Sequence, residues 1–195
     1  AREYLAALRA GDLIPARVTH MEPFGAFLDI GCGISSLLSV DCISVSRISH
    51  PRDRLRVGAE LFVAIKSIDR ESGRIYVTLR ELLGTWEENA QRFKVGQTVA
   101  GVVRSIENYG IFVELTPNLA GLAEYREGVF SGQTAAVYIK SILPDKMKVK
   151  LIIIDSFEGD SQKLPLKYYS NEEHIDFWKY SPQGSSKNVE TIFIN

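Results

Sequence analysis

The chain has 195 residues, of which 45% are hydrophobic, and its formal net charge is −1. This composition is typical of globular protein and excludes wholesale disorder. The near-neutral balance excludes a chain that attracts nucleic acid through net charge alone, so any such binding needs clustered charge. No apolar run approaches the ~18 residues of a membrane helix, and no signal peptide opens the sequence. We therefore expect a cytoplasmic protein with no membrane partner.

Residues 1–10 have a helical pattern and run directly into Gly11. The chain also lacks an initiating Met. We expect this stretch to be a connecting helix that follows a missing N-terminal part. Two cysteines, Cys32 and Cys42, have no CxxC or metal-ligand spacing, so we expect two thiols in a reducing compartment and no metal site.

Residues 11–82 are expected to form the first domain from five short strands, at 14–21, 25–30, 36–39, 60–68 and 74–79. In the second of them Ala26, Leu28 and Ile30 alternate on a face that can be buried. Phe27 then points to the other face, and a large ring there needs a reason. Gly25 permits a bulge or a tight turn that would bring Phe24 to the same side.

Residues 83–93 are expected to form a short linker helix, because Thr85 followed by Glu88 is a capping box. Trp86, Ala90 and Phe93 then recur at helical spacing and are expected to pack against a barrel.

Residues 94–157 repeat the first domain. At a shift of 85 residues Gly25 meets Gly110 and Phe27 meets Phe112, and after a loop the shift becomes 74. The expected strands are 98–106, 111–115, 121–123, 134–142 and 148–154. Five strands in each of two copies favour an all-β chain with two small closed barrels in tandem.

Residues 158–195 form a C-terminal extension with many large rings and three candidate strands, at 164–169, 174–180 and 188–194. Such rings are costly to leave in water. We expect this tail to pack on the second barrel.

The two copies together resemble a known family over about residues 11–155. The first copy resembles the S1-type RNA-binding domain through Gly11-Asp12, Ala16-Arg17-Val18, the run Phe24 to Gly31, Val57-Gly58, Ile68-Asp69, Gly73-Arg74-Ile75 and Leu79. The second copy does so through Gly96 to Val99, Tyr109 to Val113, Gly121-Leu122 and Gly132-Gln133. The tandem arrangement is similar to that of short bacterial proteins that resemble ribosomal protein S1.

The resemblance implies five-stranded OB-fold barrels that hold single-stranded RNA on one face. The implied partners are messenger RNA and the small ribosomal subunit, and no cofactor is implied. Carried over by position, the face corresponds to Phe24, Phe27, Asp69, Arg74, Tyr109, Phe112 and Lys148. Strand alternation adds three more outward-facing side chains, Arg17, Tyr76 and Lys150. Arg104, in the first strand of the second copy, is also expected to face outward. Both copies depart from the family pattern, because its common histidine falls at Ser39 and at Glu124, and its aspartate falls at Leu143 in the second copy.

An enzyme is not expected, because the three histidines are scattered and no nucleophile motif, phosphate-cradling loop or metal cluster is present. The aromatic side chains have a second interpretation, namely packing against the linker or the tail. The competing function is a protein-docking module in a ribosomal or RNA-processing assembly, since OB-type barrels carry many functions. Salt response separates the two, because RNA binding weakens steeply as salt rises.

Overall fold

The chain folds into two compact units, which are described one at a time. The structure is a computed structural model that describes residues 2–159 and 164–194. The first unit contains the chain up to Gly84 together with Lys167–Lys179 and the segment from Glu190 onwards. The second unit contains Thr85–Leu166 and Tyr180–Val189. Neither unit is therefore a single continuous stretch of sequence.

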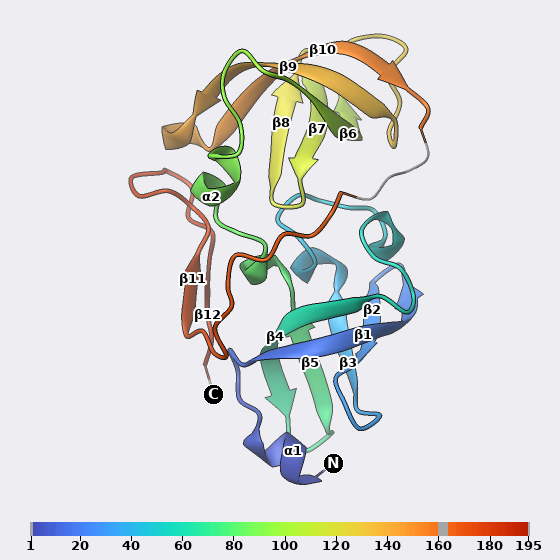
Figure 1. The fold of residues 1–195 in the computed structure, drawn as a ribbon, viewed down its shortest axis with the longest axis vertical. Helices are drawn as coiled ribbons and strands as arrows, with labels where there is room; N and C mark the ends of the chain where they lie inside the picture. Colours follow the sequence, from blue (N-terminus) through green and yellow to red (C-terminus); the bar gives the residue numbers. More distant parts are fainter. Residues whose placement is uncertain (1, 160–163, 195) are drawn as a thin grey trace. The chain divides into compact units, whose positions relative to one another are not determined.

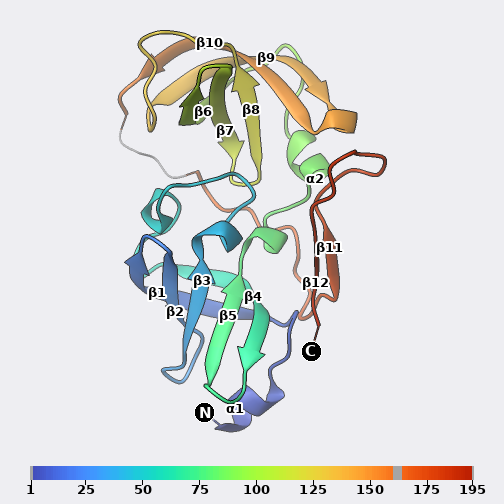
Figure 2. The same cartoon turned by 180° about the vertical axis from the view of Figure 1, so that it is seen from behind.

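The first unit is built around a closed five-stranded barrel, as predicted. Its strands are β1 (Leu13–Glu22), β2 (Gly25–Asp29), β3 (Ser35–Ser39), β4 (Glu60–Asp69) and β5 (Arg74–Thr78). They follow the order β1-β2-β3-β5-β4, and the β3–β5 pair is parallel while the other pairs are antiparallel. Figures 1 and 2 show the two sides of this barrel.

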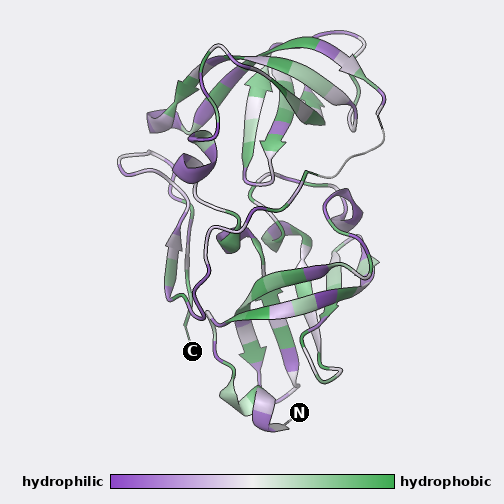
Figure 3. Ribbon diagram, in the orientation of Figure 1, coloured by the Kyte–Doolittle hydropathy of each residue, from purple (hydrophilic) through white to green (hydrophobic). Residues whose placement is uncertain are grey.

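The core of the first barrel follows the predicted alternation. Ala26 and Leu28 are fully buried and Ile30 is 2% exposed. They meet the inward residues of the other strands, of which Val18, Leu38, Val63 and Ile65 are fully buried. Figure 3 shows the same alternation as hydrophobic and hydrophilic segments along each strand. Closure of the barrel pairs the backbone hydrogen-bonding groups of both edge strands. The outward side chains are therefore available to contact other molecules or other parts of the chain.

The second unit repeats this barrel. Its strands are β6 (Thr98–Glu107), β7 (Gly110–Thr116), β8 (Leu119–Ala123), β9 (Thr134–Leu143) and β10 (Lys148–Phe157), in the closed order β10-β8-β7-β6-β9. Here β8 and β10 form the parallel pair. The predicted inward residues Ile111 and Val113 are fully buried, and Leu115 is 5% exposed.

Helical segments are short. In the part of the chain that the structure describes they are α1 (Arg2–Ala7), α2 (Trp86–Ala90) and four 3₁₀ turns at Val40–Cys42, Pro51–Asp53, Arg80–Leu82 and Pro144–Lys146. The predicted capping box is present, since Thr85 Oγ1 accepts from Glu88 N and Glu88 Oε1 accepts from Thr85 N. α2 is shorter than the expected 83–93, and buried Trp86 belongs to the second unit. Among the described residues, no helix has the length and apolar character needed to cross a membrane.

The tail is divided between the two units, whereas all of it was expected to pack on the second barrel. Lys167–Lys179 and the segment from Glu190 onwards belong to the first unit, and the stretch up to Leu166 together with Tyr180–Val189 belongs to the second. Within the first unit β11 (Phe177–Lys179) pairs with β12 (Glu190–Ile192). Phe193 joins a buried cluster with Ala10, Ala64 and Leu82, against which Leu13, Tyr168 and Ile175 also pack. The physical reason is that the outer side of the β1–β4 pair is apolar and needs this cover.

Two polar contacts fix the tail to the first barrel. Tyr168 Oη accepts from the backbone N–H of Phe62 at 3.2 Å, and the two rings meet edge to face at 5.8 Å. Thr191 Oγ1 donates to Glu81 Oε2 at 2.9 Å, and Thr78 Oγ1 donates to the other oxygen of this buried carboxylate. These contacts join segments that are far apart in sequence.

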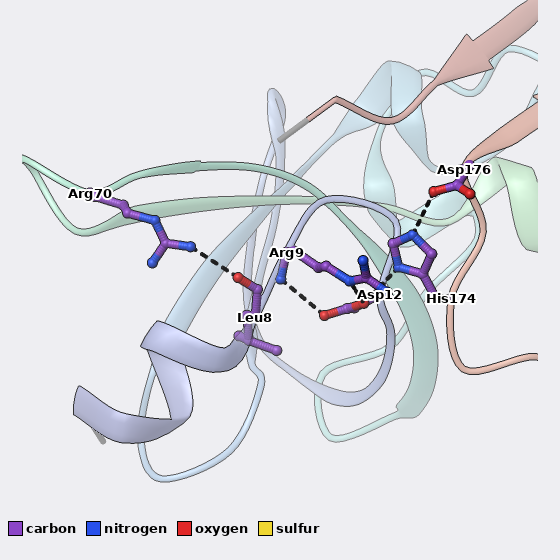
Figure 4. A network of polar contacts seen from close by, with 6 residues as sticks. All are labelled: Leu8, Arg9, Asp12, Arg70, His174 and Asp176. Carbon is purple, nitrogen blue, oxygen red and sulfur yellow. Dashed lines mark hydrogen bonds and ion pairs between the residues drawn. The ribbon is translucent and has the colours of Figure 1, made fainter.

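A third contact is the network drawn in Figure 4, in which the His174 ring lies between two carboxylates. Its Nδ1 is 2.7 Å from Asp12 Oδ1 and its Nε2 is 2.8 Å from Asp176 Oδ1. Asp12 Oδ2 also accepts from Arg9 N. The hydrogen bonds to Asp176 and then to Asp12 raise the pKa of His174 above its usual value. His174 thus links the start of β1 to the tail.

Candidate nucleic-acid interface

A row of outward side chains crosses four strands of the first barrel. His20 on β1 pairs with Phe27 on β2, Phe27 pairs with Leu37 on β3, and Leu37 pairs with Tyr76 on β5. Residues paired directly across strands point to the same face of a sheet. His20 is exposed and the other three side chains are half-buried. We call this set the aromatic row.

Phe24 lies beside the aromatic row, as predicted. Its ring meets that of Phe27 edge to face, with centroids 6.0 Å apart, and Phe24 is 55% exposed. Gly25 permits this geometry through close strand approach, because a Cβ there would lie 2.5 Å from the carbonyl oxygen of Leu38. The bulge of β1 falls elsewhere, between Val18 and His20. The glycine therefore brings β2 close to β3 and sets the position of the two rings.

Charged groups lie two or three residues further along the same strands. Arg17 pairs with Asp29 on β2, and its side chain is 53% exposed with Nη2 4.0 Å from the carboxylate. Arg74 is exposed and pairs with Asp69 at the β4–β5 hairpin. Two cations thus lie on the same face as the rings, where a polyanion can reach them.

Asp69 acts chiefly as a turn residue. Its Oδ1 accepts from the backbone N–H groups of Glu71 and Ser72. Hydrogen bonds from Ser72 lower the pKa of Asp69, and nearby Arg74 adds to the effect. The carboxylate is therefore ionised and engaged in shaping the hairpin that carries Arg74.

The second barrel has the equivalent row with different chemistry. Ser105 on β6 pairs with Phe112 on β7, Phe112 pairs with Leu122 on β8, and Leu122 pairs with Lys150 on β10. The ring of Tyr109 meets that of Phe112 edge to face at 6.1 Å, and Tyr109 is 66% exposed. One aromatic pair is kept, but serine replaces His20 and lysine replaces Tyr76.

Further charges of the second barrel lie around this row. Lys148 and Lys150 are exposed on one face of β10, as predicted. Glu124 follows β8 and is exposed as well. Arg104 was expected to face outward, but its side chain is only 15% exposed and it pairs with buried Glu114. The reason is a bulge between Val103 and Ser105, which interrupts the alternation of β6 at that arginine.

The structure brings most of the predicted residues onto one face of each barrel. Phe24, Phe27, Tyr76, Arg17 and Arg74 gather on the first barrel, and Tyr109, Phe112, Lys148 and Lys150 gather on the second. Two residues in the aromatic row, His20 and Leu37, were not predicted as site residues. The sequence shows that His20 lies shortly before Phe24 and Gly25 in a predicted strand. Only the cross-strand pairing shows that its ring meets that of Phe27.

Not every arginine of the first barrel is available. In the loop between β3 and β4, Arg54 is buried and its Nη2 donates to Ser44 Oγ at 3.0 Å, whereas Arg52 and Arg56 are exposed. Within residues 2–159 and 164–194, no group of three or more His, Cys, Asp or Glu side chains is placed to hold a metal ion. The chemistry offered by the face is therefore aromatic stacking combined with positive charge.

Comparison with known proteins gives a family for the first barrel. The S1 RNA binding domain family matches residues 7–80. The small ribosomal subunit protein bS1 homolog of Bacillus subtilis (strain 168) is 29% identical over 197 residues, which cover 98% of this chain and 50% of that protein. Small ribosomal subunit protein bS1 of Staphylococcus aureus (strain COL) is 36% identical over 126 residues, or 64% of this chain and 32% of that protein.

The chain therefore spans half or less of the length of these relatives. A crystal structure of a multidomain protein with nucleic acid binding domains from Streptococcus pneumoniae TIGR4 covers 76% of this chain and 54% of its own, with 19% identity. The TM-score of this match is 0.35. The family match and the bS1 relatives agree with each other: residues 7–80 match the S1 RNA binding domain family, and nearly the whole chain is similar to a bS1 homolog.

Proposed function

We propose that the chain binds single-stranded RNA without catalysis, through the outward aromatic and basic side chains of its barrels. The observation that carries the proposal is the aromatic row with Phe24 beside it, on the barrel that matches the S1 RNA binding domain family. Single-stranded bases stack on exposed rings at a gain of ~1–3 kcal/mol per base, whatever their sequence. Exposed Arg17 and Arg74 take the phosphates.

The first barrel is the main contact in this proposal. Its row offers three rings, and cations lie on the same face. The second barrel offers Tyr109, Phe112 and Lys150, but Glu124 near its face repels phosphate. The resemblance to bS1 proteins, which are small ribosomal subunit proteins by name, supports messenger RNA and the small ribosomal subunit as partners in translation.

The test is fluorescence anisotropy of a labelled single-stranded RNA of about twelve nucleotides, within the site sizes of OB-folds. The expected result is saturable binding that weakens with salt, with a slope of about −0.7 per phosphate contact. Phe27→Ala is expected to weaken binding about tenfold or more, and Phe112→Ala to weaken it less. Phe177→Ala removes a phenylalanine that is 52% exposed on β11 and is the matched control. Absence of binding at low salt would overturn the proposal.

The alternative function is protein docking, and a negative RNA result would favour it. Three large side chains of the tail, Trp178, Tyr180 and Phe193, are buried against the chain itself and do not offer a docking surface. Apolar side chains on the outer side of β10 remain exposed, namely Ile152, Ile154 and Phe157.

A further inference from the structure

His20 is a ring of the aromatic row that neither the family pattern nor strand alternation assigns to the face. It lies on β1, directly opposite Phe27, and the two ring planes are within 26° of parallel with centroids 5.9 Å apart. This is an offset-stacked arrangement, in which each ring leaves much of its face uncovered. Phe24 meets the same Phe27 ring edge to face. Three rings therefore form one continuous surface across the β1–β2 hairpin.

Glu22 holds the imidazole in this position. Its Oε1 is 2.6 Å from His20 Nε2, two residues further along the strand. The side chain of His20 is 59% exposed, so the ring is held by the carboxylate and by Phe27 while its outer face stays open to solvent. A ring that is fixed in place loses less entropy when a base stacks on it.

The second barrel gives a natural comparison. Its strand β6 has Ser105 opposite Phe112, where β1 has His20 opposite Phe27, and it keeps a glutamate two residues later at Glu107. The hairpin geometry is therefore the same in the two barrels, including the edge-to-face aromatic pair. What differs at this position is the ring itself.

We propose that His20 is a nucleobase-stacking residue, positioned by Glu22, which extends the platform of the first barrel by one nucleotide. The inference rests on the proposed RNA-binding function and adds to it a contact that the second barrel lacks. An unpaired base lies on the imidazole face next to the base held by Phe27. Leu37 provides an apolar surface on the other side of Phe27, toward Tyr76.

Two substitutions separate stacking from charge or hydrogen bonding. His20→Ser places the residue of the second barrel at this position, and His20→Phe keeps a ring but removes the polar nitrogens. If the ring stacks a base, His20→Ser weakens binding of the labelled RNA about five- to tenfold, at the low end of the gain per stacked base. His20→Phe then binds within about twofold of wild type. Equal losses in both variants would overturn stacking and indicate a polar contact.

A second RNA probe shows whether any loss of affinity depends on the bases. A strand of the same length with abasic sugars keeps the phosphates but has no bases to stack. His20→Ser is expected to bind this probe as wild type does and to keep the salt slope of wild type on the intact strand. A smaller salt slope, by about 0.7, would show that His20 contacts a phosphate and would overturn the proposal.

The outcomes distinguish this inference from the function on which it rests. If wild type binds RNA and Phe27→Ala weakens binding while His20→Ser has no effect, the role of His20 is refuted and the function stands. If wild type binds no RNA, the proposed RNA-binding function and the role of His20 are both refuted. Far-UV circular dichroism and the melting temperature must match wild type for each variant, which is expected because His20 is exposed.

Discussion

Arg104 and Glu114 form a buried ion pair on neighbouring strands of the second barrel. Nε and Nη2 of the arginine both donate to Glu114 Oε2, at 2.9 and 2.8 Å, and the glutamate side chain is fully buried. Only Glu114 of this pair has a charged counterpart in the first barrel, because Thr19 stands at the position of Arg104. There Asp29 takes the place of Glu114, and its partner Arg17 is 53% exposed at 4.0 Å. One position of the repeat thus has a structural pair in one barrel and a surface pair in the other.

The first prediction concerns these two pairs. Arg104→Met is expected to destabilise the second barrel by about 3–5 kcal/mol, because it leaves a buried carboxylate without its cation. Arg17→Met is the matched control and should cost about 0–1 kcal/mol, because exposed pairs contribute little. Urea unfolding of both variants measures the difference. Equal losses would contradict the assignment of Arg104 to a structural role.

The second prediction concerns Gly25. Gly25→Ala places a Cβ 2.5 Å from the Leu38 carbonyl oxygen, so β2 and β3 must move apart. We expect a loss of about 1–3 kcal/mol in the stability of the first barrel, as for other overpacked sites, and weaker RNA binding because Phe24 and Phe27 shift. The control is Gly33→Asn, since nothing lies within 4 Å of that Cβ and asparagine tolerates the positive φ of 72°. A stable Gly25→Ala protein with wild-type affinity would contradict the prediction.

The third prediction is a pH dependence from His174. Its raised pKa means that the protonated ring binds its carboxylates best in the folded chain. This stability is fully present below the ordinary histidine pKa of about 6.5 and is lost as pH rises through the higher pKa of the folded state. Docking of the tail on the first barrel should therefore be stronger at pH values below the ordinary histidine pKa than above the raised pKa of the folded state.

Trp178 provides a probe of this effect, because it is buried in the tail and the only other tryptophan is Trp86. In a Trp86→Phe background, urea unfolding followed by Trp178 fluorescence at several pH values reports on the tail. His174→Gln should remove much of the pH dependence. Parallel curves for the two proteins would show that His174 does not link pH to the docking of the tail.

The fourth prediction compares the two rows. Tyr76 and Lys150 occupy equivalent positions, next to Leu37 and Leu122. Lys150→Ala should reduce the magnitude of the salt slope of RNA binding by about 0.7, the value for one phosphate contact. Tyr76→Ala should weaken binding without changing the slope, because stacking releases no counterions. Anisotropy titrations at four salt concentrations measure both, and an unchanged slope for Lys150→Ala would exclude a phosphate contact there.

Much of the fold could be predicted from the sequence because the strands are marked by the local alternation of apolar and polar residues. The alternation of Ala26, Leu28 and Ile30, and its repetition at Ile111, Val113 and Leu115, correctly predicted two buried faces and the outward rings of Phe27 and Phe112. The five strands of each barrel were found for the same reason. Such patterns depend only on neighbours along one strand, which the sequence shows directly.

The rest depends on contacts between distant residues. A bulge breaks the alternation of β6, and so Arg104 was wrongly predicted to face outward. His20 joins the aromatic row only through its pairing with Phe27, which strand periodicity does not reveal. The apolar character of the tail predicted that it packs on a barrel, but nothing in it favoured the first barrel, where Phe193 meets Ala10 and Ala64.

The location of the tail also bears on how the chain folds during synthesis. Leu82 and Ala64 of the first barrel are covered in part by Phe193, which the ribosome adds only after the entire second barrel. Domains usually fold as units in the order of synthesis. The first barrel of this chain must instead wait with part of its apolar surface exposed, or covered by something else, until the tail arrives. Emergence of the tail from the ribosome would then be the step that completes the first unit.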